Sequence, residues 1–318
     1  MLSLQPEVEA LRIDGVLGEA SASRMIALER RELFSLHYEL RAMIYGGLLL
    51  IVGGVGILIR TNVDRIGPAV LIAAIAVASA ICYAIPFFSR HSAKLPDSRV
   101  FLEYSLLLGA LLASADLGYA VNQYAIFGEN WRLQFLILAV FHSVTAYLFS
   151  SRSLLAVAIT ALASWLGLSD SGLTTWLDGG SGGADLAGRG LFCALLILIW
   201  RQLHARLSSV GDFLPVFSHF IANVALLASL AMITDSNREI PGLILLLLFS
   251  GLAVVYGLRT GRETFVIYGV AYGLLGVDFF VLDRRVHTAA LVAGWLLIST
   301  AAAAFALFRF HRSFRSDL

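Results

Sequence analysis

Long apolar stretches recur along the chain, separated by short segments that carry charged residues, glycine or proline. About 20 mostly apolar residues are needed for a helix to cross a hydrocarbon core of about 30 Å. Two weak candidates are 154–168, which is short, and 186–203, which carries Arg189 and Arg201 near its ends. The clear candidate spans are 42–59, 66–88, 100–121, 131–149, 213–233, 240–258, 265–282 and 286–308. The pattern predicts an all-α polytopic transmembrane helical bundle of about ten spans, or eight if neither weak candidate crosses.

The residues before the first span are patterned differently, because Arg and Glu are distributed throughout 1–41. Leu4, Val8 and Leu11 recur at near-helical spacing, a turn is expected at Asp14-Gly15, and a second helix is expected to follow. The apolar positions of this hairpin either pack within it or lie on the bilayer surface. We therefore expect a cytoplasmic helical hairpin over 1–41, a transmembrane domain over 42–308 and a cytoplasmic tail over 309–318.

Composition supports the membrane interpretation. Hydrophobic residues make up 58% and charged residues 14% of the chain, and the mean hydropathy is +0.82, whereas soluble domains are about 45–50% apolar and about 25% charged. These values exclude a soluble globular protein. The formal net charge of +1 gives no electrostatic case for nucleic-acid binding. The expected partners are the lipid bilayer and, through residues 1–41, another protein.

The distribution of Lys and Arg predicts the orientation. If the N-terminus is cytoplasmic, 16 of the 23 basic residues fall on the cytoplasmic side and 7 on the other. Positive residues accumulate in cytoplasmic connections, and an even number of spans places both termini on one side. We expect a multi-pass protein of a bacterial inner membrane with cytoplasmic N- and C-termini.

Polar residues inside the spans are candidate functional residues, because placing a polar side chain in the hydrocarbon core costs free energy. Asp116, Tyr119 and Gln123 follow at i, i+3 and i+7 and form one stripe on a helix. Asp278, on another span, is estimated to lie at a similar depth in the outer half. These four residues form a candidate polar pocket that faces outward. The same stripe is equally suited to a hydrogen-bonded contact between helices.

Two further polar positions are secondary candidates. His142 lies near the middle of its span, and His219 and Asn223 share one helical face at i and i+4. A neutral imidazole can relay protons or bind a metal, and it can also be a structural link between helices. The sequence contains no motif for a nucleophile, a phosphate loop or a zinc site. We therefore expect no enzymatic activity, no cofactor and no metal site.

Three passages resemble a family of bacterial membrane proteins known as domain of unknown function 2157. They are the hairpin LRIDGVLGEASASRMIALERREL, the glycine-rich span YGGLLLIVGGVGILIRTNVDRIGP, and the passage from LLGALLASADLGYAVNQYAIFGENW to SWLGL. The resemblance covers roughly residues 8–168. It implies a polar link at Gln123-Tyr124, Gly128 and Trp131 between two spans, and a short connection at Ser150 to Ser153 between the next two. The family has no established activity, so the resemblance implies topology alone.

The sequence is compatible with two classes of function. The favoured class is a non-catalytic membrane module that engages a partner protein. The alternative is a transporter or lipid-handling protein in which the polar stripe lines an outward-facing pocket. Coupled transporters usually carry more intramembrane charge, or broken helices, than this chain does.

Overall fold

The computed structural model describes residues 5–13, isolated positions between 18 and 57, and then 67–89, 96–168, 183–207, 212–235, 237–285 and 289–316. The chain divides into two compact units. One comprises Met1–Asn62 with Arg312–Leu318, and the other comprises Val63–His311. Within the first unit, helix α1 (Gln5–Ile13) coincides with the first helix of the predicted hairpin. The second helix of that hairpin lies largely outside the described residues.

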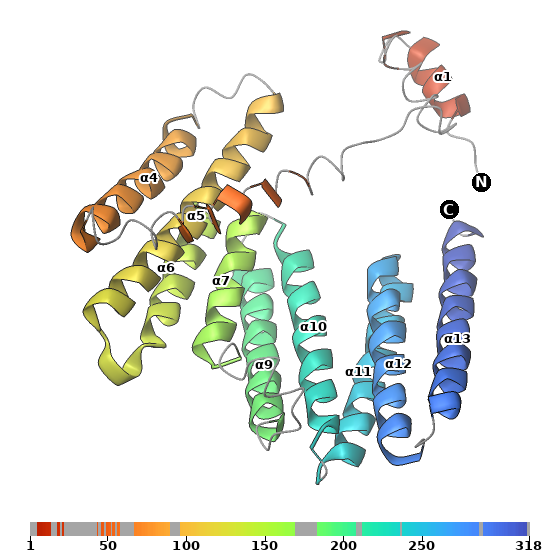
Figure 1. The fold of residues 1–318 in the computed structure, drawn as a ribbon. Coiled ribbons are helices and arrows are strands. Elements are labelled where there is room, and N and C mark those ends of the chain that lie inside the picture. Colours follow the sequence, from red (N-terminus) through yellow and green to blue (C-terminus); the bar gives the residue numbers. More distant parts are fainter. Residues whose placement is uncertain are drawn as a thin grey trace. The chain divides into compact units, whose positions relative to one another are not determined.

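The second unit is a helical bundle (Figure 1). Every regular element among the described residues is a helix, as predicted for an all-α protein. The order is α4 (Pro68–Ser89), α5 (Pro96–Tyr124), the short 3-10 helix η1 (Gly128–Asn130), α6 (Leu133–Phe149), α7 (Arg152–Trp165), α9 (Gly183–Leu207), α10 (Leu214–Ile233), α11 (Glu239–Thr260), α12 (Glu263–Arg285) and α13 (Ala289–Ser316).

Most of the predicted spans correspond to helices of suitable length. Among the described residues, α4, α5 and α9–α13 are long and apolar enough to cross a membrane, whereas α6 and α7 are shorter. The weak candidate 186–203 is therefore a full-length helix, and the weak candidate 154–168 is the 14-residue α7. In the predicted first span, 42–59, the structure describes ten positions, and all ten are helical. Helix α13 continues to Ser316 through most of the predicted tail. The chain is a membrane protein with several apolar helices.

Neighbours in the chain pair in space, because short connections return each helix beside the previous one. The pairs are α4 with α5, α6 with α7, α9 with α10, and α11 with α12. The connection between α6 and α7 shows how little chain this needs. Ser150 ends α6 in the left-handed conformation, with φ of 52°, and the Ser151 hydroxyl caps α7 by accepting from the Leu154 backbone N–H at 3.3 Å. The predicted short connection at Ser150 to Ser153 is therefore present.

Helices α7 and α10 link these pairs into one bundle. Helix α10 packs against α7, α9, α11 and α12, while α7 also packs against α5 and α9. The main hydrophobic core lies where α5, α6, α7, α9 and α10 meet. Its fully buried side chains include Leu154, Ile159, Ile197, Phe213 and Phe217.

Glycine permits the closest helix approach in the second half of the bundle. A Cβ atom added at Gly269 on α12 would lie 2.5 Å from the Ser250 backbone oxygen and 2.7 Å from Val254 Cγ2 on α11. At Gly273, one turn further, the Ser250 Oγ would be 3.3 Å away. The sequence Gly269-x-x-x-Gly273 therefore forms the contact surface with α11, as small residues do between membrane helices.

Helix α7 ends early, and two arginines gather where it ends. At 14 residues it is about 21 Å long. Gly167, with φ of +80°, follows its last turn, and a Cβ atom there would lie 2.6 Å from an Nη atom of Arg189 and 3.2 Å from one of Arg132. The C-terminal end of a helix carries partial negative charge, which stabilises nearby cations. The end of α7 thus provides an environment for Arg189, which lies within the apolar helix α9.

Candidate functional site

A groove of about 460 Å³ runs along α10 between α9 and α11. Both flanking helices pack against α10, which forms the floor. The walls are apolar and open to the surroundings: Leu195 is 50% exposed and Leu252 is 56% exposed, whereas Leu226 on the floor is fully buried. The volume falls within the range of about 300–1,000 Å³ that is typical of small-molecule sites. The lining also includes Leu191, Ala194, Leu198, Ile221, Ala222, Ala225, Phe249, Ala253 and Phe265.

The polar lining of the groove is confined to Arg201, Ser218 and Tyr256, one from each of α9, α10 and α11. The Ser218 hydroxyl donates to the Leu214 backbone oxygen at 2.9 Å. Its oxygen therefore accepts from Arg201 Nε at 3.3 Å and faces the Tyr256 hydroxyl at 3.5 Å. Ser218 thus holds the cation and the phenol at one end of the groove.

Arg201 retains donors for another group. Its Nε atom is engaged by Ser218, and among the residues that the structure describes no carboxylate pairs with its guanidinium. A guanidinium presents a planar set of donors that suits a phosphate or carboxylate. The arrangement can therefore bind an amphiphile with an anionic end.

A hydrogen-bonded aromatic cluster fixes the same end of α9 to α6. The Tyr147 hydroxyl accepts from Trp200 Nε1 at 3.2 Å and lies 3.1 Å from His204 Nδ1. His204 is 5% exposed and packs against the rings of Phe213 and Phe217. This cluster stabilises the helix that carries Arg201. Sequence analysis missed it, because Tyr147 and His204 are 57 residues apart.

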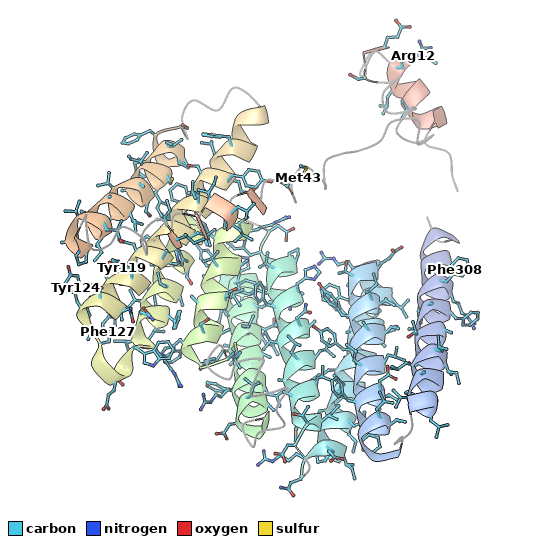
Figure 2. All side chains as sticks on the ribbon, viewed as in Figure 1. Arg12, Met43, Tyr119, Tyr124, Phe127 and Phe308 are labelled. Carbon is cyan, nitrogen blue, oxygen red and sulfur yellow. The ribbon has the colours of Figure 1, made fainter. Side chains whose placement is uncertain are left out.

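The candidate polar pocket is divided between separate parts of the bundle. Helix α5, with Asp116, Tyr119 and Gln123, packs against α4, α6 and α7, whereas α12, with Asp278, packs against α10 and α11. The structure therefore does not bring Asp278 together with the other three residues. Figure 2 shows Tyr119 and Tyr124 along the C-terminal part of α5.

Asp116 lies on the side of α5 that faces α4. Ser105 and Gly109 define that side through hydrogen bonds with Cys82 and Ser79 of α4, and Asp116 follows Gly109 by two turns. One carboxylate oxygen of Asp116 and the Tyr119 hydroxyl are buried without a hydrogen-bond partner among the described residues. Gln123, at the end of the stripe, is exposed.

Asp278 is buried and bonded to the next helix. It is 8% exposed. Trp295 Nε1 donates to its Oδ1 at 2.8 Å and the Ser299 hydroxyl donates to its Oδ2 at 3.3 Å, both from α13. This carboxylate therefore ties α12 to α13.

His142, a secondary candidate, links α6 to α5. Its side chain is fully buried, with Nε2 2.9 Å from the Ser114 hydroxyl. Ser114 donates its own proton to the Ala110 backbone oxygen at 2.8 Å. The contact between Nε2 and Ser114 links the two helices, and the buried Nδ1 has no hydrogen-bond partner within the described part of the chain.

The other secondary candidates, His219 and Asn223, connect α10 to α12. The His219 ring stacks on Phe265 with centroids 4.7 Å apart. Asn223 donates to the His219 backbone oxygen at 2.9 Å and accepts from the Tyr272 hydroxyl at 3.2 Å. No group of three His, Cys, Asp or Glu side chains suited to a metal ion occurs among the described residues.

Comparison with known proteins agrees with the resemblance in the sequence. Residues 9–155 match the family described as "Predicted membrane protein (DUF2157)". The chain is therefore similar over this range to a family of predicted membrane proteins, and α4–α6 lie within the matched range. No curated protein and no solved structure matches the chain.

Proposed function

We propose that this membrane protein, whose residues 9–155 match DUF2157, is a non-catalytic module of a bacterial inner membrane that engages a partner protein. The observation that carries the proposal is the use of polar side chains as links between helices. Asp278 bonds to α13, Asn223 to α12 and His142 to α5. Polar groups of this kind hold spans together, which suits a scaffold.

The proposed orientation has both termini in the cytoplasm. It is supported by the excess of Lys and Arg, 16 against 7, in the connections that this orientation makes cytoplasmic. The N-terminal helix α1 then faces the cytoplasm, where a soluble partner can reach it.

Helix α1 offers a contact surface for that partner. Leu11 is 41% exposed and Ile13 is 74% exposed, whereas Val8 is 5% exposed. Exposed apolar side chains on a cytoplasmic helix are suited to helix-in-groove recognition, in which a few apolar residues serve as anchors.

Site-specific photo-crosslinking in native membranes tests partner binding. A photoreactive residue at Ile13 is expected to give a discrete crosslinked species, and the same residue at Val8 serves as the buried control. Adding Leu11→Glu to the Ile13 probe is expected to reduce the crosslink at least threefold. Equal yields at the two probe positions, or a crosslink insensitive to Leu11→Glu, would contradict the proposal.

A second candidate function, lipid handling, is supported by the groove along α10. Its apolar walls open to the surroundings and its polar residues gather at one end. The transporter form of this alternative required Asp116 and Asp278 to line one path. Because α5 and α12 pack against different helices, the two aspartates do not line one path, and the groove along α10 supports lipid handling alone.

A further inference from the structure

We infer that the groove along α10 holds one phospholipid with an anionic headgroup, with the phosphate at Arg201 and an acyl chain along the apolar walls. The inference rests on the lipid-handling candidate and is independent of partner binding by α1. It names the class of lipid and the residues that select it.

The dimensions of the groove suit a lipid of a single leaflet. Along α10 the lining runs from Ser218 to Leu226, eight residues or about 12 Å. One leaflet contributes about half of a hydrocarbon core of about 30 Å. Ser218 lies four residues inside the start of α10 at Leu214, close enough to the helix end for Arg201 to extend toward the headgroup region. The apolar lining continues from there toward the middle of the helix.

Charge complementarity favours an anionic headgroup. Among the described residues, the lining contains Arg201 and no carboxylate, and Ser218 occupies only the Nε atom of the guanidinium. The Nη groups remain to donate to phosphate oxygens, and the Tyr256 hydroxyl stands beside them at Ser218. Charge-assisted hydrogen bonds from arginine to phosphate are stronger than those between neutral groups.

The surrounding charges reinforce this preference. Arg206 on α9 and Arg259 on α11 lie at the same ends of their helices as Arg201 and Tyr256. In the orientation proposed above, this end is cytoplasmic, and the cytoplasmic leaflet carries the anionic lipids that attract basic residues. Arg201 differs from Arg206 because it alone of the two lines the groove.

Native mass spectrometry of the full chain tests the inference. The detergent-purified protein is incubated with phosphatidylglycerol or with phosphatidylethanolamine of the same acyl chains, and bound lipid is counted for each. The wild type is expected to retain phosphatidylglycerol at least fivefold more than phosphatidylethanolamine. Arg201→Gln is expected to remove most of this preference, whereas Arg201→Lys keeps part of it because the charge remains.

Matched variants distinguish an effect on lipid binding in the groove from a general effect of substitution on the protein. Arg206→Gln removes one charge from the same exposed helix end, outside the groove, and is expected to reduce the preference much less than Arg201→Gln does. Ala222→Phe fills the groove and is expected to lower retention of both lipids at least threefold. The same change at the exposed Ala205, outside the groove, is expected to have no effect. A melting temperature within a few degrees of the wild type confirms that each variant is folded.

The outcomes distinguish failure of the headgroup assignment from failure of lipid binding. Equal retention of the two lipids, or an equal loss in Arg201→Gln and Arg206→Gln, would overturn the anionic headgroup and leave lipid handling in place. Retention unaffected by Ala222→Phe would place the lipid elsewhere and overturn both. A lipid-free dimer that Ala222→Phe dissociates would identify a second copy as the occupant and would also overturn both.

Discussion

Trp295 on α13 donates a hydrogen bond across 2.8 Å to a carboxylate oxygen of Asp278 on α12. Ser299, one turn further along α13, donates to the other oxygen. The two donors lie on one face of α13 at i and i+4, so a single buried carboxylate fixes the rotation of one helix against the other.

Loss of the indole donor should weaken this attachment. Trp295→Phe keeps an aromatic ring but leaves Asp278 Oδ1 buried without its partner, which costs about 1–3 kcal/mol. We expect a lower melting temperature in detergent and cleavage of α13 by protease at lower temperature. Leu297→Val, at a side chain that is 73% exposed, is the control and should leave both unchanged. A wild-type melting temperature for Trp295→Phe would show that the bond contributes nothing.

The Tyr147 hydroxyl bridges two side chains of α9 and should be required for full stability. Tyr147→Phe removes the acceptor of Trp200 Nε1 and the partner of His204 Nδ1, at a cost of about 1–3 kcal/mol. Tyr124→Phe is the control, because that side chain is 53% exposed at the end of α5. The readout is thermal unfolding followed by tryptophan fluorescence. Equal melting temperatures for the two variants would disprove a structural role of the bridge.

A single methyl group at Gly269 should separate α11 from α12. Gly269→Ala places a Cβ atom 2.5 Å from the Ser250 backbone oxygen, and such overpacking costs about 1–3 kcal/mol. Gly251→Ala on α11 meets nothing within 4 Å and is expected to be neutral or slightly stabilising, because alanine favours helix. The ratio of monodisperse to aggregated protein after extraction measures the difference. Similar ratios for the two variants would contradict the close packing.

Asp116 and Asp278 should respond differently to the same substitution. One carboxylate oxygen of Asp116 is buried without a hydrogen-bond partner among the described residues, so Asp116→Asn should maintain or raise the folded yield in detergent. Asp278→Asn keeps an acceptor for Trp295 but replaces the oxygen that accepts from Ser299 with an amide nitrogen, so its yield should fall. A loss of yield in Asp116→Asn would make the stripe structural, whereas normal yield with a growth or uptake defect would revive the pocket of Asp116, Tyr119 and Gln123.

Reporter fusions test the proposed orientation. A fusion after Asp178 is expected to report the periplasmic side, and a fusion at the C-terminus is expected to report the cytoplasmic side. Alkaline phosphatase and green fluorescent protein respond in opposite ways and provide the internal control. The same side for both positions would overturn either the orientation or the number of spans.

The sequence predicts where the helices lie along the chain better than it predicts which helices pack against one another. Apolar length alone is enough to locate α4, α10 and α11 within a few residues, because the hydrocarbon core sets a minimum length. It does not set the lateral order or rotation of helices. Helix rise predicts a similar depth for Asp116 and Asp278, yet their helices pack against different partners.

The groove illustrates the same limit. The sequence predicts that Arg201 lies near the end of a weak candidate span, and Arg201 does lie near the C-terminal end of α9. Its contact with Ser218 depends on α9 packing against α10, and its proximity to Tyr256 depends on α11 packing on the same helix. Hydropathy carries no information on either contact.

The short length of α7 can be compared with the thickness of the hydrocarbon core that its neighbours cross. A helix of about 21 Å falls about 9 Å short of a hydrocarbon core of about 30 Å. A hydrophobic mismatch of this kind ordinarily reduces the thickness of the surrounding bilayer. Here α7 packs against α5, α6, α9 and α10, and the guanidinium groups of Arg132 and Arg189 lie close to the residue Gly167 that follows its last turn. The two guanidinium groups therefore lie beyond the end of α7, at a position that further turns of a longer helix would otherwise occupy.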